Sequence, residues 1–201
     1  MLNEEQKKKL LNIARQTIEA YIKERRVPQF SEDDPELSKS YGAFVTLRKC
    51  TLNRARSGSG PRSKSRDDEE SLRGCIGHII SKEPLYKVVR DMTIASSTQD
   101  PRFPPVTANE LKDIKIEISV LSVPKLIKDI KEFELGKHGV IVQKGYNQGV
   151  FLPQVATETG WGKEEFLSNL CSHKAGLSSD AWKDKDTKIY IFEAEVFEEE
   201  Q

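Results

Sequence analysis

Several features that would place a protein in a well-marked class are scarce or missing in this sequence. The 201 residues include only three cysteines, Cys50, Cys75 and Cys171, with no CxxC spacing. An odd number of unpaired cysteines disfavours a disulfide framework and favours free thiols in a reducing compartment. No P-loop, dinucleotide fingerprint, HExxH or GxSxG sequence occurs, so the best-marked enzyme classes are disfavoured as well.

The chain also lacks an excess of one charge and a long apolar run. Lys+Arg and Asp+Glu number 32 each, so the composition does not indicate a strongly basic nucleic-acid-binding domain. No apolar run approaches the ~18 to 20 residues that cross a membrane. The first 26 residues form a charged helical pattern without the apolar core of a signal peptide. We therefore expect a cytoplasmic globular protein without a membrane partner.

Apolar periodicity predicts helices and strands in mixed order. Residues 1–26 have helical spacing, and Asn3 with Gln6 forms a capping box at the start. Strict alternation predicts a strand from Ile114 to Val120, and further strands are expected at residues 42–47 and 72–77 and in a hairpin within 140–152. Because no regular βαβ rhythm occurs, we predict an α+β fold with a mainly antiparallel sheet and flanking helices.

Residues 54–70 differ in composition from the rest of the chain. A Ser/Gly/Arg/Lys tract is followed there by four acidic residues, and the segment lacks the apolar content of a packed core. We predict a flexible inserted loop. Its basic half could touch nucleic acid, but the acidic run can neutralise it and no aromatic residues interleave, so nucleic-acid binding is disfavoured.

The predicted strand at residues 72–77 is unusual because it contains a thiol, a guanidinium and two glycines. Glycine weakens a strand interior, so Gly74 and Gly77 predict a bulge or a close approach by another backbone or a ligand. In a regular strand Arg73, Cys75 and Gly77 share one face. A fixed positive charge beside a thiol favours the thiolate, and Gly77 leaves room above it.

Cys75 has two alternative roles. It is either a nucleophile or redox thiol, with His78 or His138 as the base after folding, or a small buried hydrophobic residue. A zinc site at Cys75 and His78 is disfavoured, because residues three apart on a strand face opposite sides. We therefore expect neither a metal nor a cofactor.

The two arginines in this part of the chain also have two alternative roles. Three prolines around Arg102 and Phe103 predict a rigid, extended turn. Arg73 and Arg102 either bind a carboxylate or phosphate, or form internal salt bridges with Glu117 or Asp100.

Four stretches, taken together, resemble the AMMECR-one domain family. They are Leu72 to Gly77 (LRGCIG), Asp100 to Pro105, Ile116 to Leu121, and Leu152 to Val155. Cys171 and the sequence KAGL at residues 174–177 are also similar to that family. The likeness covers residues 41–197, with the first helix as the usual lead-in.

The resemblance implies one domain over residues 1–201, with a larger lobe, a smaller lobe within 124–160 and a cleft near the LRGCIG strand. It assigns no reaction, and it implies an association of microbial members with Memo-like and radical SAM proteins. The sequence departs from the family in its longer 54–70 tract and at His78, a variable position, which weakens a role for His78 as base or ligand.

We expect the cleft to bind a small anionic molecule or a peptide end. The residues expected to line it are Arg73, Gly74, Cys75, Gly77, Arg102, Phe103, Glu117, His138 and Gln154. In an enzyme, Cys75 would be the nucleophile, His138 its base and Glu117 the group that orients the base. In the alternative, a non-catalytic protein-interaction or nucleic-acid-related regulatory module, the same residues would form a groove for a partner.

Overall fold

The computed structural model describes residues 2–51 and 69–200. The chain divides into two compact units, Met1–Val120 with Val196–Gln201 as the first and Leu121–Glu195 as the second. The predicted loop at 54–70 lies outside the described residues except for its last two, which begin a strand.

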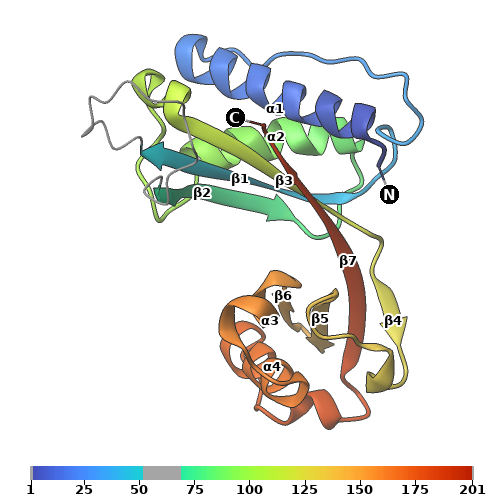
Figure 1. Cartoon of the computed structure of the whole chain (residues 1–201). Helices are drawn as coiled ribbons and strands as arrows, with labels where there is room; N and C mark the ends of the chain where they lie inside the picture. The colour runs from blue at the N-terminus through green and yellow to red at the C-terminus, as the bar shows by residue number, and fades with distance from the viewer. Residues whose placement is uncertain (1, 52–68, 201) are drawn as a thin grey trace, which may run out of the picture. The chain divides into compact units, whose positions relative to one another are not determined.

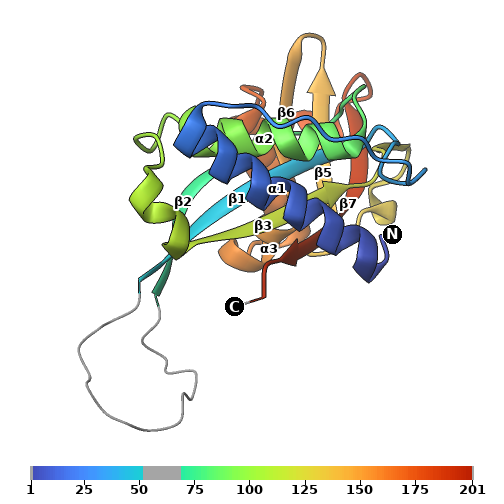
Figure 2. The same ribbon diagram turned by 90° about the horizontal axis from the view of Figure 1, so that it is seen from above.

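The first unit consists of a small sheet covered by two helices. Its elements are α1 (Glu4–Glu24), β1 (Gly42–Thr51), β2 (Glu69–His78), α2 (Leu85–Thr98), the 3₁₀ helix η1 (Ala108–Asp113) and β3 (Ile114–Leu121). Strand β1 lies between β2 and β3 and is antiparallel to β2. Helices α1 and α2 cover one face of this sheet (Figure 1) and lie side by side over it (Figure 2). The predicted capping box of Asn3 with Gln6 is confirmed at the start of α1.

The core of the first unit lies between these helices and the sheet. Fully buried members include Leu10 and Ile18 of α1, Val89 of α2, Leu47 of β1 and Ile116 of β3. Each such side chain contributes about 1.5 to 3 kcal/mol through removal of apolar surface from water. The alternation of apolar residues along β1 and β3 therefore leaves the other face of the sheet for polar side chains.

The second unit packs short helices against a small antiparallel sheet. Its elements are β4 (Lys125–Ile127), η2 (Ile130–Glu132), β5 (His138–Lys144), β6 (Asn147–Phe151), α3 (Gln154–Thr159), α4 (Lys163–Asn169), the π-helical segment η3 (Leu170–Lys174), η4 (Ala181–Lys183) and β7 (Lys188–Glu198). The last three residues of β7 belong to the first unit. Strand β5 pairs antiparallel with β6 and with β7, and β4 pairs antiparallel with β7. The predicted hairpin is thus confirmed.

The predicted fold class is confirmed, since helices flank mainly antiparallel strands. Cys171 is fully buried in the core of the second unit, beside aromatic residues such as Phe166. Along residues 2–51 and 69–200, no helix has the length and apolar character needed to span a membrane.

Candidate functional site

Strand β2 contains a bulge, and Arg73 is its extra residue. In the pairing with β1, Gly74 lies opposite Leu47 and Leu72 lies opposite Arg48, so Arg73 has no counterpart. A bulge interrupts the alternation of side chains along a strand. The bulge predicted from the glycines is confirmed, and it gives Arg73 surroundings different from those of a regular strand residue.

Gly74 lets helix α2 approach this strand closely. A Cβ atom at Gly74 would lie 2.2 Å from the carbonyl oxygen of Ser96, near the end of α2. The Ser96 hydroxyl donates to the Val45 carbonyl (2.7 Å) and accepts from the Ile76 N–H (3.0 Å), so it bridges β1 and β2. The predicted close approach by another backbone is confirmed. It fixes the end of α2 beside Cys75.

The guanidinium of Arg73 is engaged inside the first unit. Its Nε and Nη2 donate to the two carboxylate oxygens of Glu110, at 3.0 and 3.2 Å. Nη1 and Nη2 also donate to the carbonyls of Pro104 (2.8 Å) and Pro105 (3.3 Å). Only 11% of the Arg73 side chain is exposed. The hydrogen bond from Arg73 is the main cause that lowers the pKa of Glu110 to about 2, so this pair is ionised at neutral pH.

The internal partners of the arginines differ in part from the expected ones. Glu117 and Asp100 were the expected partners, and Asp100 does pair with Arg102. Arg73, however, pairs with a carboxylate that was not considered, and Glu117 lies 3.4 Å from Arg48. The sequence could not distinguish these partners, because the bulge and the turn after α2 decide which carboxylate Arg73 reaches.

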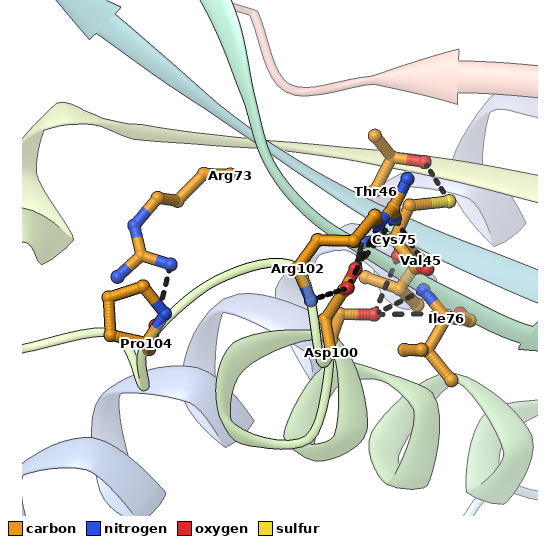
Figure 3. A network of polar contacts seen from close by, with 9 residues as sticks. Val45, Thr46, Arg73, Cys75, Ile76, Asp100, Arg102 and Pro104 are labelled. Carbon is orange, nitrogen blue, oxygen red and sulfur yellow. Dashed lines mark hydrogen bonds and ion pairs between the residues drawn. The ribbon is translucent and has the colours of Figure 1, made fainter.

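Cys75 lies on the sheet face opposite the helices. It pairs with Thr46 of β1, whose neighbours Val45 and Leu47 point into the core. The Thr46 hydroxyl donates a hydrogen bond to the sulfur of Cys75 at 3.2 Å. Figure 3 shows the sulfur beside Thr46 and the guanidinium of Arg73 extending away from it. Arg73 is therefore not the positive charge beside the thiol that the sequence predicted.

Arg102 is the guanidinium that lies next to Cys75. Its Nε and Nη2 donate to the two oxygens of Asp100, at 2.9 and 2.7 Å, and its Nη2 donates to the Cys75 carbonyl at 3.4 Å. The Cys75 N–H donates to Asp100 Oδ2 at 2.8 Å. Strand β2 lies at the edge of the sheet in the first unit. The Asp100–Arg102 pair therefore binds the backbone N–H and the backbone carbonyl of Cys75, as a neighbouring strand would.

The Asp100 and Arg102 side chains differ sharply in exposure. The Asp100 side chain is 2% exposed, whereas that of Arg102 is 53% exposed. The hydrogen bond from Arg102 is the main cause that holds the pKa of Asp100 well below its usual range. The ring of Phe103 lies 5.5 Å from the Arg102 guanidinium carbon and 6.0 Å from that of Arg73. A buried carboxylate thus orients a half-exposed guanidinium.

Gly77 does not leave open space above the strand, contrary to the expectation. A Cβ atom there would lie 2.3 Å from the ring of Phe44, the residue opposite it on β1. The missing side chain makes room for an aromatic ring of the same sheet. The role of Gly77 in ligand binding stays a prediction.

His138 and Gln154 belong to the second unit. His138 Nδ1 accepts a hydrogen bond from the Glu134 N–H at 3.0 Å, and Nε2 lies 3.8 Å from Glu193 Oε1. The Oε1 of Gln154 is enclosed without a hydrogen-bond partner among the described residues. The roles of His138 as base, with Glu117 orienting it, and of Gln154 as a ligand-binding residue stay predictions.

Three residues that matter for this geometry were not singled out from the sequence. Thr46 could have been noticed as the polar position between two buried strand residues, and Glu110 was recognisable only as the capping-box partner of Thr107. Ser96 carries no sequence signal for its bridging role. The first unit therefore brings together Thr46, Cys75, Asp100, Arg102 and Phe103 around the bulged strand.

These features define an α+β protein with a cysteine on a bulged edge strand, beside a buried aspartate that pairs with a half-exposed arginine. Residues 11–197 match the model of the AMMECR1 family, and the chain belongs to this family.

Relatives of similar length occur in archaea. The chain is 42% identical over 197 residues to a protein of Thermococcus onnurineus, covering 95% of this chain and 89% of that one. It is 37% identical to a protein of Methanosarcina mazei, covering 100% of this chain and 95% of that one. The crystal structure of the uncharacterized protein PH0010 from Pyrococcus horikoshii is similar, with a TM-score of 0.77, 40% identity, and coverage of 95% and 90% of the two chains.

Proposed function

We propose that the region around Arg102 in the first unit binds a small anionic ligand, such as a carboxylate or the carboxyl end of a peptide. The observation that carries this proposal is the orientation of a half-exposed guanidinium by the buried Asp100. None of the described residues accepts a hydrogen bond from Arg102 Nη1. A guanidinium fixed in advance loses little freedom on binding, and its N–H groups match carboxylate oxygens.

The local charge supports an anionic ligand. Lys49 and Arg73 both pair with Glu110, and Arg102 pairs with Asp100. These three cations and two carboxylates carry a net charge of +1. Such a local excess of positive charge attracts anions, and it does so although the whole chain has no net charge.

Binding is tested by nuclear magnetic resonance titration of the full-length protein with acetate and N-acetylglycine. We expect the backbone amide of Cys75 and the Nε–H of Arg102 to shift with saturation, and Arg102→Gln to abolish the response. Arg26→Gln is the matched control, because Arg26 is 60% exposed and pairs with a carboxylate two residues earlier, as Arg102 does. Equal loss in both variants, or no saturable shift in the unmodified protein, would refute the proposal.

Thiol chemistry at Cys75 is the enzymatic form of the same proposal. The hydrogen bond from the Thr46 hydroxyl to the sulfur supports it, because a donor to sulfur stabilises the thiolate that acts as nucleophile. Cys171 provides an internal comparison, since burial raises the pKa of its thiol. Because Cys171 is fully buried, the decisive reference is a free thiol: in a Cys50→Ser background, we expect iodoacetamide to label Cys75 faster than both Cys171 and free glutathione at neutral pH. Equal or slower labelling would remove the nucleophile from the proposal.

A further inference from the structure

We propose that Asp100 is the specificity-determining residue of the Arg102 site and restricts it to singly charged anions. The inference rests on the proposed function. Asp100 would not itself touch the ligand, but it would decide which anions bind to Arg102.

The first step is the geometry of the Arg102 donors. Asp100 occupies Nε and one hydrogen of Nη2, and the Cys75 carbonyl accepts from Nη2 as well. A ligand therefore meets the guanidinium from the Nη1 end and cannot form the side-on bidentate pair that Asp100 already forms. This geometry suits a ligand that binds through one oxygen better than a dianion that binds through two parallel hydrogen bonds.

The second step is charge. Asp100 is almost fully buried, and it accepts hydrogen bonds from the backbone N–H groups of Cys75 and Arg102 in addition to the guanidinium. It thus keeps its negative charge over the range in which proteins are usually handled. With Glu110 it leaves only one uncompensated positive charge among Lys49, Arg73 and Arg102. One such charge is matched by a monoanion, whereas a dianion brings a second charge close to the Asp100 carboxylate.

The test compares methanesulfonate with sulfate, two tetrahedral anions that differ in charge, in the same titration at constant ionic strength. We expect the unmodified protein to prefer methanesulfonate. Asp100→Asn should shift the ratio of the two affinities toward sulfate by about tenfold, the effect of one unit charge roughly 6 Å away at an effective dielectric constant of roughly 40. Glu24→Gln is the matched control, because it removes a carboxylate that pairs with an exposed arginine elsewhere in the first unit.

A second variant covers the case in which Asp100→Asn does not fold. Lys49 is 38% exposed, so Lys49→Gln should fold, and it lowers the local charge to zero. We expect it to shift the ratio toward methanesulfonate by about threefold. If the ratio of the methanesulfonate and sulfate affinities stayed unchanged in the folded variants while acetate still bound, the role of Asp100 would be overturned and the proposed function would stand. Absence of any saturable shift in the unmodified protein would overturn this inference and the proposed function together.

Discussion

Arg73 and Arg102 lie near the same aromatic ring, yet their surroundings are opposite. Arg73 is 11% exposed and donates four hydrogen bonds to Glu110 and to two proline carbonyls. Arg102 is 53% exposed, and its guanidinium donates hydrogen bonds to Asp100 and to the Cys75 carbonyl. One guanidinium is therefore part of the folded framework, and the other is presented to solvent.

The difference shows that one arginine can be part of the folded framework while another near it in space stays accessible to solvent. The bulge turns Arg73 toward η1, where Glu110 also accepts hydrogen bonds from the N–H and hydroxyl of Thr107. Arg73 thus ties the edge strand to the start of η1. The turn that carries Arg102 is fixed on both sides, by Asp100 and by this tie.

Replacing each arginine by alanine tests the comparison most directly. Arg73→Ala leaves the Glu110 carboxylate without its main partner in a largely buried setting, and we expect a loss of about 4 kcal/mol in the free energy of unfolding. Urea denaturation followed by circular dichroism measures it. If Arg73→Ala cost no more than Arg102→Ala, the contrast between the two residues would be wrong.

The pH dependence of the free energy of unfolding tests whether the buried Arg73–Glu110 pair stabilises the fold. The pKa of Glu110 is about 2 in the folded protein and 4.5 ordinarily. Ionised Glu110 therefore stabilises the folded state fully above pH 4.5, and this stabilisation is lost as the pH falls through 2. The contribution to the free energy of unfolding is about 3 kcal/mol. In acid denaturation, Glu110→Gln should make the free energy of unfolding depend less steeply on pH in this range. If the dependence stayed as steep, other carboxylates, such as Asp100, would be its cause.

Gly74 tests whether the bulged strand depends on its contact with α2. Gly74→Ala places a Cβ atom 2.2 Å from a backbone oxygen, which cannot move without shifting the helix, so we expect a loss of about 2 kcal/mol. Gly162→Ala is the control, since nothing lies within 4 Å of a Cβ atom there. The control should cost at most about 1 kcal/mol, from a weaker helix N-cap. Thermal unfolding of both variants gives the comparison.

Arg102→Ala should have the smallest effect on stability. Half of the side chain is exposed, so solvent screens its ion pair, and water can reach Asp100 once the guanidinium is removed. Asp100 also keeps its hydrogen bonds from the backbone N–H groups of Cys75 and residue 102, so we expect a loss of about 1 kcal/mol. The same variant should lose the anion response entirely. Chemical denaturation and the acetate titration on one sample separate the two effects; a large loss of stability with retained binding would reverse the assignments of Arg73 and Arg102.

Much of the first unit could be predicted from local sequence signals. The Asn3–Gln6 capping box, the alternation of Ile114 to Val120 and the glycines at positions 74 and 77 each act over a few residues. Such signals are independent of the rest of the chain, because they arise from helix capping, strand pleating and backbone sterics. The fold class followed from their order.

The partners of the charged and polar side chains could not be predicted in the same way. Arg73 was expected beside Cys75, since a regular strand would place both on one face, but the bulge separates them. The hydroxyl of Thr46 contacts the sulfur of Cys75 instead, and the guanidinium of Arg102 contacts the backbone carbonyl of Cys75.

The sequence by itself thus determined the α+β class and the position of the strand that contains the bulge. Only the tertiary structure decided that Arg73 forms a buried ion pair with Glu110, and that Asp100 orients Arg102 next to the Cys75 carbonyl. The physical reason is that an ion pair depends on distance and burial between residues far apart in the chain, and neither quantity is encoded in local spacing.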